Sequence, residues 1–433
     1  MSHIQDKSFW YSALRKYVDA TFFMAYRQFK YVGLDKIPTD GAILFAPNHA
    51  NALMDALAVL VVDKQPTVFV ARADIFKKPI VARILRFLKI MPILRIRDGF
   101  KNLKQNDAIM EQAVDVLLDK VPFCIMPEGT HRAQHSLLPL VKGIFRIALL
   151  TNERAAGKMP VYIVPLGIEY GNYYRYRSSL LVSVGDPINV TTFVQEHSTL
   201  AVPDMINALR DELTDRLKQV MLYIPDNEMY EAIYELCLIS TPGRLRTLSI
   251  KNDVETRLQV NKSVVADMLA LKEVDELKAN DLLTQLTEFA RLRRSQKISA
   301  NSLSVNNFGL SLCGQLLFLI VTFPYFLLAA VVTLPIWSVS EHIVSRLDDP
   351  VFKNSFRYVL TLLITPVIWV IAIVVCFTLF SWPWALVFFL LILPAHLFLH
   401  DYLRVLRLCL SDYRLARNKQ LRTLLTQIKL LFH

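Results

Sequence analysis

Residues 45–60 read FAPNHANALMDALAVL, and they join one apolar run to another through a polar turn. The first run, AILFAPN at 42–48, has the composition of a buried strand, and the second has the spacing of a helix beginning near Ala50. This order places His49 at the carboxyl edge of a sheet, where ligands bind in open α/β folds. The stretch therefore predicts an α/β domain with a polar site at that edge.

The same turn holds a histidine and an acid, with five residues between His49 and Asp55. Asp55, about one and a half turns into the expected helix, can fold back toward the imidazole. A carboxylate on one ring nitrogen fixes the tautomer and leaves the other nitrogen free to take a proton from a hydroxyl. The alternative is that Asn48 caps the helix, with the histidine and the aspartate as incidental polar residues. This stretch alone leaves both interpretations open.

Strand-like runs recur between helical patterns such as the one at 106–120. They lie at 42–48, 67–72, 89–96, 122–129, 161–170 and 180–188. Alternation of this kind predicts a largely parallel or mixed sheet flanked by helices. We expect this domain to occupy residues 31–200.

The C-terminal third is expected to be a membrane anchor, because residues 298–340 and 358–400 contain no Asp, Glu, Lys or Arg. Each stretch exceeds the roughly 20 apolar residues that span a bilayer. We expect transmembrane segments over 298–400 and a basic cytoplasmic tail over 401–433. Lysine and arginine crowd both flanks, which predicts two or four crossings if both flanks are cytoplasmic. Because residues 1–18 lack a signal-peptide core, the front half should also stay on the cytoplasmic face.

The remaining segments are expected to be helical. Residues 1–30 predict amphipathic helices at the membrane, and the charged segment 201–297 predicts a helical linker subdomain. Residues 77–104 hold nine basic residues and one acid, a pattern that fits either an interfacial helix or a solvated face. The net charge of +11 therefore indicates anionic membrane lipids, and no nucleic acid, as partners. Five scattered cysteines without paired spacing indicate reduced thiols.

Three further strand ends carry polar chemistry. IMPEGTHR at 125–132 ends on a turn of Glu128, Gly129 and Thr130, whose N–H groups could hold a phosphate or an oxyanion. KIMPILRIRDG at 89–99 ends on Arg95 and Arg97, and VYIVPLGIEY at 161–170 is interrupted by Pro165. Together with His49 they form a constellation at one edge of one domain.

The ordered set NHANALMD, MPILRIRD, MPEGTH, VYIVPLGI and VSVGDPI resembles the glycerophospholipid acyltransferases over about residues 28–190. The resemblance implies a glycerolipid acyltransferase-like mixed sheet, with His49 as general base and Asp55 as its orienting carboxylate. Arg95 or Arg97 would bind the acceptor's phosphate, and the Glu128–Thr130 turn would shape the acceptor pocket. Pro165 and Gly167 match a strand linked to the acyl chain or donor.

The resemblance implies no cofactor: acyl-CoA or acyl-carrier protein supplies the acyl group as a co-substrate. A thioester is already activated, so a positioned base suffices without a metal. His131 and His135 are expected to be solvated loop histidines and not metal ligands. His131 stands where the family commonly has an arginine after EGT, and Arg132 follows it, which leaves their roles in acceptor binding open.

The five-residue spacing between His49 and Asp55 is one longer than usual in the superfamily. It is similar to a branch of glycerol-3-phosphate and dihydroxyacetone-phosphate acyltransferases with C-terminal transmembrane segments. The expected reaction is therefore acylation of glycerol 3-phosphate in phospholipid biosynthesis. A lysophosphatidate acyltransferase that makes phosphatidate is the alternative acceptor class, and a non-catalytic membrane scaffold on the same fold is a third interpretation.

Overall fold

The computed structural model describes residues 3–6, 8–93, 103–225 and 227–432, which divide into two compact units. The first comprises residues 1–174 and 178–222, and the second comprises 175–177 and 223–433. Arg95 and Arg97 lie outside the described residues.

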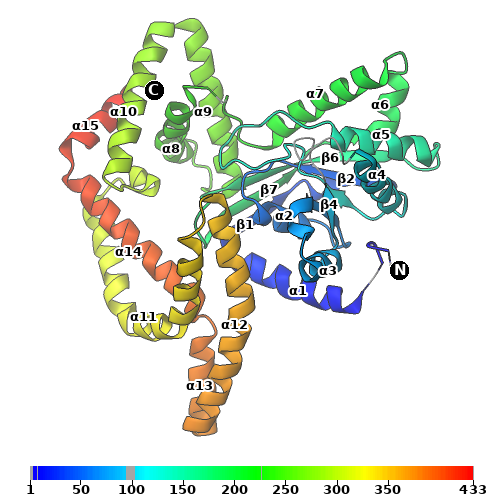
Figure 1. Ribbon diagram of the computed structural model, residues 1–433. Helices are drawn as coiled ribbons and strands as arrows, with labels where there is room; N and C mark the ends of the chain where they lie inside the picture. Colours follow the sequence, from blue (N-terminus) through cyan, green and yellow to red (C-terminus); the bar gives the residue numbers. More distant parts are fainter. Residues whose placement is uncertain (1–2, 7, 94–102, 226, 433) are drawn as a thin grey trace. The chain divides into compact units, whose positions relative to one another are not determined.

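The first unit is built on one mixed sheet (Figure 1). Its strands are β1 Tyr26–Val32, β2 Ala42–Pro47, β3 Val68–Arg72, β4 Ile90–Ile93, β5 Phe123–Cys124, β6 Val161–Tyr170, β7 Ser178–Val184 and β8 Ile188–Asn189. They follow the order β1-β7-β6-β2-β5-β3-β4, and β8 pairs with β6. Only the pairs of β6 with β7 and with β8 are antiparallel among these described strands. The predicted mixed sheet flanked by helices is therefore confirmed.

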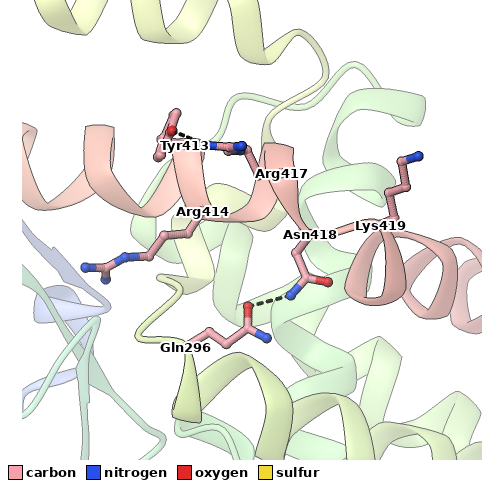
Figure 2. A pocket seen from close by; sticks show the side chains of 6 residues that line it. All are labelled: Gln296, Tyr413, Arg414, Arg417, Asn418 and Lys419. Carbon is pink, nitrogen blue, oxygen red and sulfur yellow. Dashed lines mark hydrogen bonds between the residues drawn. The ribbon is translucent and has the colours of Figure 1, made fainter.

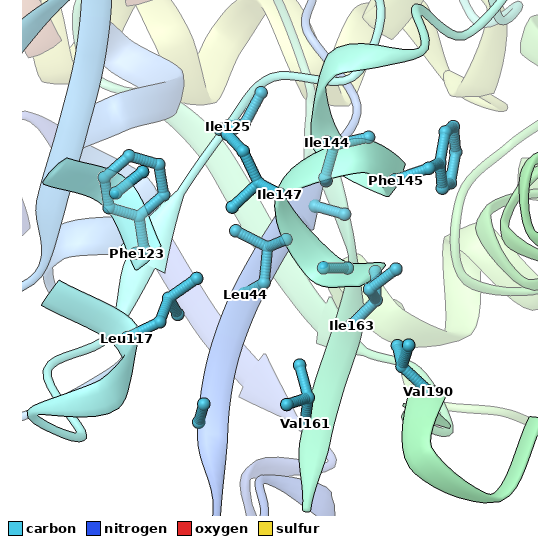
Figure 3. Packing of buried hydrophobic residues seen from close by; sticks show 14 of the residues in the cluster. Leu44, Leu117, Phe123, Ile125, Ile144, Phe145, Ile147, Val161, Ile163 and Val190 are labelled. Carbon is cyan, nitrogen blue, oxygen red and sulfur yellow. The ribbon is translucent and has the colours of Figure 1, made fainter. Parts of the chain in front are cut away.

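Helices surround this sheet. They are α1 Phe9–Met24, α2 Leu53–Leu60, α3 Pro79–Phe87, α4 Leu103–Leu118, α5 Gly143–Ala155, α6 Val190–Glu196 and α7 Val202–Val220. One core cluster joins the sheet to α4, α5 and α7 through apolar side chains such as Leu44, Leu117, Ile147 and Ile163, several of which Figure 3 shows in contact. Every residue of β2 is buried, so both faces of the central strand are covered and its carboxyl end is the place where polar side chains can reach solvent.

The structure differs from the sequence prediction at both ends of this unit. Residues Tyr26–Val32 form an edge strand, although residues 1–30 were expected to be helical. The helix α7 packs into the core of the first unit through Met205, Leu209, Leu213 and Leu217. The α/β unit therefore extends to Leu222, beyond the expected limit at residue 200, because the charges of α7 cover only its outer face.

The second unit is helical. Its helices are α8 Tyr230–Thr247, α9 Val254–Val274, α10 Glu276–Ser295, α11 Phe308–Val344, α12 Val351–Leu379, α13 Trp382–Ile392, α14 Ala395–Arg417 and α15 Lys419–Phe432. A buried bidentate pair fixes α10 against α8: Arg293 Nε donates to Glu235 Oε1 at 2.5 Å and Nη2 donates to Oε2 at 2.7 Å.

Two helices of this unit, α11 and α12, are long and apolar enough to cross a membrane, and α13 with α14 forms a bent pair that makes a third candidate. The bend between α13 and α14 is 47°. The first apolar helix begins at Phe308, ten residues after the expected start at 298, and runs through Pro324 and Pro335 without ending. Within the second uncharged stretch, α12 ends at Leu379 and α13 begins at Trp382, with Ser381 at its N-cap.

Candidate active site

Asn48 sets the position of His49 by extending the pairing between β2 and β6. Its backbone N–H donates to Leu166 O at 3.2 Å, and its side-chain amide exchanges two hydrogen bonds with the backbone of Ile168. The side-chain amide of Asn48 therefore replaces one further backbone pairing between β2 and β6, and His49 follows just beyond the end of the strand. Asn48 does not cap the following helix: α2 begins at Leu53, not near Ala50, and Ala52 precedes it.

Asp55 orients the ring of His49 through its Nδ1 atom. His49 Nδ1 lies 2.8 Å from Asp55 Oδ2, and the aspartate side chain has no exposed surface while 14% of the histidine side chain is exposed. The same oxygen accepts the N–H groups of Ala50 at 2.8 Å and Asn51 at 2.6 Å. The other oxygen accepts the Tyr170 hydroxyl at 2.7 Å. Four donors therefore surround this one buried carboxylate.

This arrangement fixes the tautomer of His49. An ionised carboxylate only accepts hydrogen bonds, so Nδ1 carries the proton and Nε2 of the neutral ring keeps its lone pair. The pair can thus do what a general base requires: the exposed nitrogen accepts a proton while the buried carboxylate compensates the charge that forms on the ring.

The turn of residues 50–52 explains why α2 starts late. Two of its N–H groups point at Asp55, and Ala52 has φ 47° and ψ −120°, a conformation that costs an L-residue free energy. Asp55 therefore lies in the first turn of α2 and satisfies N–H groups that precede the helix. The sequence pattern placed it one turn further along.

Glu128 anchors the backbone of His49. Its Oε1 accepts the His49 N–H at 2.6 Å, and its Oε2 accepts the Leu138 N–H at 2.8 Å. Burial raises the pKa of Glu128 to about 7, the two backbone N–H groups oppose that rise, and the charge of Asp55 adds to it. Both oxygens of this carboxylate accept backbone N–H groups, so Glu128 positions the backbone of His49.

The residues after Glu128 form the wall beside His49. Gly129 has φ 65°, which favours glycine, and Thr130 is exposed. The rings of His131 and His49 meet edge to face, with centroids 5.4 Å apart. Arg132 donates its backbone N–H to His49 O at 3.1 Å and its Nη2 to Ser136 Oγ at 2.9 Å. The structure therefore brings the whole EGTHR stretch to the histidine.

Pro165 lies elsewhere, buried in the middle of β6 opposite Ala46. It occupies the point where the antiparallel neighbour of β6 changes from β8 to β7, so its missing N–H leaves no ladder bond unmade. Gly167 lies against the end of α7, where a Cβ atom would be 2.1 Å from Val220 O. These two positions serve packing in this structure, and their predicted link to the donor stays a prediction.

Sequence reasoning missed the polar residues at the end of β6. Tyr170 binds Asp55, and Glu169 Oε2 lies 3.0 Å from Nδ1 of His135. Tyr173 contacts the same histidine at 3.2 Å and accepts Asn51 Nδ2 on its carbonyl at 3.0 Å. The signal was available, because β6 runs parallel to β2 and both strands end at the same sheet edge.

No group of three or more His, Cys, Asp or Glu side chains among the described residues could hold a metal ion. A hollow of about 430 Å³ lies in the second unit (Figure 2), lined by Gln296, Tyr413, Arg414, Arg417, Asn418 and Lys419. It contains no histidine and no carboxylate.

Comparison with known proteins identifies an acyltransferase domain in this part of the chain. The sequence profile of the acyltransferase family matches residues 28–169, which include His49, Asp55 and the EGTHR stretch. The chain is 26% identical over 160 residues to glycerol-3-phosphate O-acyltransferase 2 of Saccharomyces cerevisiae, covering 36% of this chain and 21% of the yeast protein. It is 30% identical over 106 residues to glycerol-3-phosphate O-acyltransferase 1 of the same yeast, covering 24% and 14%. The matches thus span about a fifth or less of each curated relative.

Among solved structures, the chain is similar to the 1-acyl-sn-glycerophosphate acyltransferase PlsC from Thermotoga maritima, with 17% identity and a TM-score of 0.35. That match covers 48% of this chain and 78% of the other. The family profile, the two yeast relatives and the ordered motifs agree on one assignment: residues 28–169 form an acyltransferase domain similar to those of the glycerophospholipid acyltransferases.

Proposed function

We propose that this protein transfers a fatty acyl group from an acyl thioester to the primary hydroxyl of glycerol 3-phosphate. The observation that carries the proposal is the contact of 2.8 Å between His49 Nδ1 and the fully buried Asp55. Because the Asp55 carboxylate orients the ring through Nδ1, Nε2 of His49 remains available at the solvent-accessible edge of the sheet.

In the proposed reaction, His49 Nε2 takes the proton of the acceptor hydroxyl as its oxygen attacks the thioester carbonyl. A carbon–oxygen bond forms, the carbon–sulfur bond breaks, and the departing thiolate receives the proton from the imidazolium. Asp55 stabilises the imidazolium in between. The chain itself forms no covalent acyl intermediate in this scheme.

Arg132, whose backbone N–H donates to His49 O, brings a cationic side chain to this loop, which supports an anionic acceptor. Arg132 lies in the same loop as Glu128 and donates to Ser136, while the His131 ring contacts the base. The family resemblance assigns the phosphate to Arg95 or Arg97, and arginine suits that role because its planar fork binds phosphate oxygens in pairs.

Glycerol 3-phosphate is favoured as the acceptor by two facts. The five-residue spacing resembles the branch that acylates small phosphorylated acceptors, and both yeast relatives carry glycerol-3-phosphate O-acyltransferase as their names. The test is an assay of the purified full chain with palmitoyl-CoA or palmitoyl-carrier protein and one of three acceptors: glycerol 3-phosphate, dihydroxyacetone phosphate or lysophosphatidate. We expect product from glycerol 3-phosphate. Product from lysophosphatidate alone would replace this acceptor, and no product from any acceptor would favour the scaffold.

We also propose that the acyltransferase unit lies on the cytoplasmic face of a membrane that α11 and α12 enter. Basic residues on both sides of the apolar region support this orientation, including Arg294 and Lys297 before it and Arg414 and Arg417 after it. Thr130 is exposed, so labelling of the Thr130→Cys variant with an impermeant thiol reagent tests which face of the membrane carries the unit. Labelling in inside-out vesicles and protection in intact cells is the expected result.

A further inference from the structure

Five arginines of the second unit lie close to the ends of its uncharged stretches, where charged residues begin. This arginine cluster consists of Arg175, Arg177, Arg357, Arg404 and Arg407. Glu341 is the first charged residue after the uncharged stretch 298–340. Arg357 is the last before the uncharged stretch 358–400, and Asp401 is the first after it. In a membrane, such a change in composition marks the depth of the lipid headgroups.

The fold brings these boundary residues together. Arg357 Nε donates to Glu341 Oε1 at 2.8 Å and Nη2 donates to Oε2 at 3.1 Å, which joins α12 to α11. Arg177 Nη2 donates to Asp401 Oδ2 at 2.8 Å. The polar ends of the apolar helices therefore form one charged layer within this unit.

Positive charge exceeds negative charge in this layer. Arg177 and Arg404 pair with Asp401, and Arg357 pairs with Glu341, whereas Arg175 forms no ion pair among the described residues. Arg407 forms a hydrogen bond with Leu403 O of its own helix at 3.1 Å and no ion pair among the described residues. Its guanidinium instead experiences the positive charges of Arg175, Arg357 and Arg404. Like charges at such positions repel one another unless an anion lies between them.

Two histidines complete the polar lining. The rings of His396 and His400 are 4.8 Å apart, and the Tyr176 ring lies 4.8 Å from His400. Both ring nitrogens of His396 are buried and have no hydrogen-bond partner in the described structure. A buried imidazole without hydrogen-bond partners is a costly arrangement, and an additional acceptor would satisfy its N–H group.

We propose that the arginine cluster binds the phosphate group of an anionic lipid, with Arg407 and His396 among its donors. A phosphate supplies the missing negative charge and several acceptor oxygens at the depth where lipid phosphates occur. Its acyl chains would lie along the exposed apolar side chains of α12, such as Leu363 and Val367. This proposal does not depend on which acceptor is acylated.

Native mass spectrometry of the purified full chain tests the site, with dioleoyl phosphatidate, phosphatidylglycerol and phosphatidylcholine titrated in turn. We expect the anionic lipids to bind more tightly than phosphatidylcholine, and Arg407→Gln to weaken that binding about tenfold through loss of one charge-assisted contact. Arg407→Lys keeps the charge and should recover part of the affinity. Preference for phosphatidate would assign the site to a phosphomonoester lipid, and equal binding of phosphatidylglycerol would assign it to anionic bilayer lipids in general.

Arg417→Gln is the matched control, because Arg417 lies on the same helix, is exposed and contacts Tyr413 in the hollow of Figure 2. Equal losses in the two glutamine variants, or equal affinity of the unmodified chain for phosphatidylcholine, would overturn the proposal. Circular dichroism of each variant identifies any that has lost its helices, and Arg407→Lys then provides the decisive comparison.

Discussion

The hydroxyl of Tyr170 donates to Asp55 Oδ1 at 2.7 Å, on the side of the carboxylate opposite His49. Tyr170 lies at the end of β6, so the strand beside β2 supplies the second support of the pair formed by His49 and Asp55. The carboxylate is thereby held at both oxygens, and its orientation toward the imidazole does not depend on the histidine alone.

Replacement of Tyr170 by phenylalanine tests this support. The change leaves Asp55 Oδ1 buried without that donor, which costs about 1–3 kcal/mol and loosens the aspartate. We expect kcat to fall roughly three- to thirtyfold with little change in the KM for either substrate, because Tyr170 acts through Asp55. Steady-state kinetics of the purified chain measure both constants.

Tyr162→Phe is the control for that variant. Tyr162 lies on the same strand and donates to the exposed residue Asp40 at 3.3 Å, away from Asp55. The Tyr162→Phe variant should have the same kcat as the unmodified chain. An unchanged kcat in Tyr170→Phe would show that the tyrosine does not position the carboxylate.

Glu128 predicts a pH dependence of stability. Its pKa of about 7 in the folded protein lies above its ordinary value of 4.5, because burial disfavours the charged form. Between these two values the folded state binds more protons than the unfolded state, so the contribution of this group to the free energy of unfolding falls as pH rises from about 4.5 to 7. The total loss is at most roughly 3 kcal/mol.

Thermal unfolding midpoints measured from pH 5 to pH 8 check this prediction. The difference between the unmodified chain and Glu128→Gln should shrink as pH rises, whereas the difference to Glu153→Gln, at an exposed site on α5, should stay constant. A constant difference for Glu128→Gln would mean that the buried carboxyl does not titrate in this range.

The fold was accessible from the sequence because its strands are short apolar runs with clear ends. The general position of the site could also be predicted from the sequence. His49 follows β2, Glu128 follows β5, and β6 ends at the same edge of the sheet. The start of α2 was not, since Ala52 adopts a backbone conformation that no residue preference signals. The role of α7 was hidden by its charges, which cover the face turned away from the core.

The buried pair of Arg293 and Glu235 should dominate the stability of the helical unit. Arg293→Met leaves Glu235 as an uncompensated buried charge, which costs about 3–5 kcal/mol. Cys237 on α8 is 1% exposed, so its reaction with a thiol reagent under native conditions reports opening of this region. We expect labelling of Cys237, located by peptide mass spectrometry, to accelerate by about two orders of magnitude or more.

Arg291→Met provides the comparison. Arg291 pairs with Glu288 on the surface of the same helix, and solvent screens such exposed pairs, so they contribute little to stability. Similar labelling rates for the Arg291 and Arg293 variants would contradict a structural role of the buried pair.

The α3 surface should contact anionic lipid. Ile80 and Ile84 are 73% and 52% exposed, and Arg83 and Arg86 lie on the same helix. An environment-sensitive fluorophore on Ile84→Cys should shift to shorter wavelength when the chain is reconstituted in nanodiscs containing phosphatidylglycerol, and less so in phosphatidylcholine alone. The same fluorophore on Asp211→Cys, at an exposed position of α7, should not respond. Identical spectra at the two positions would indicate a solvated α3.

The most direct test of the account is the initial rate of acyl transfer to glycerol 3-phosphate by the His49→Ala variant. The side chain that accepts the proton is removed, while Asn48 and the backbone contact with Glu128 remain. We predict a fall in kcat of about 10²- to 10⁴-fold with unchanged membrane insertion and an unchanged thermal midpoint within a few degrees. A rate near that of the unmodified chain would contradict the assignment of His49 as the general base.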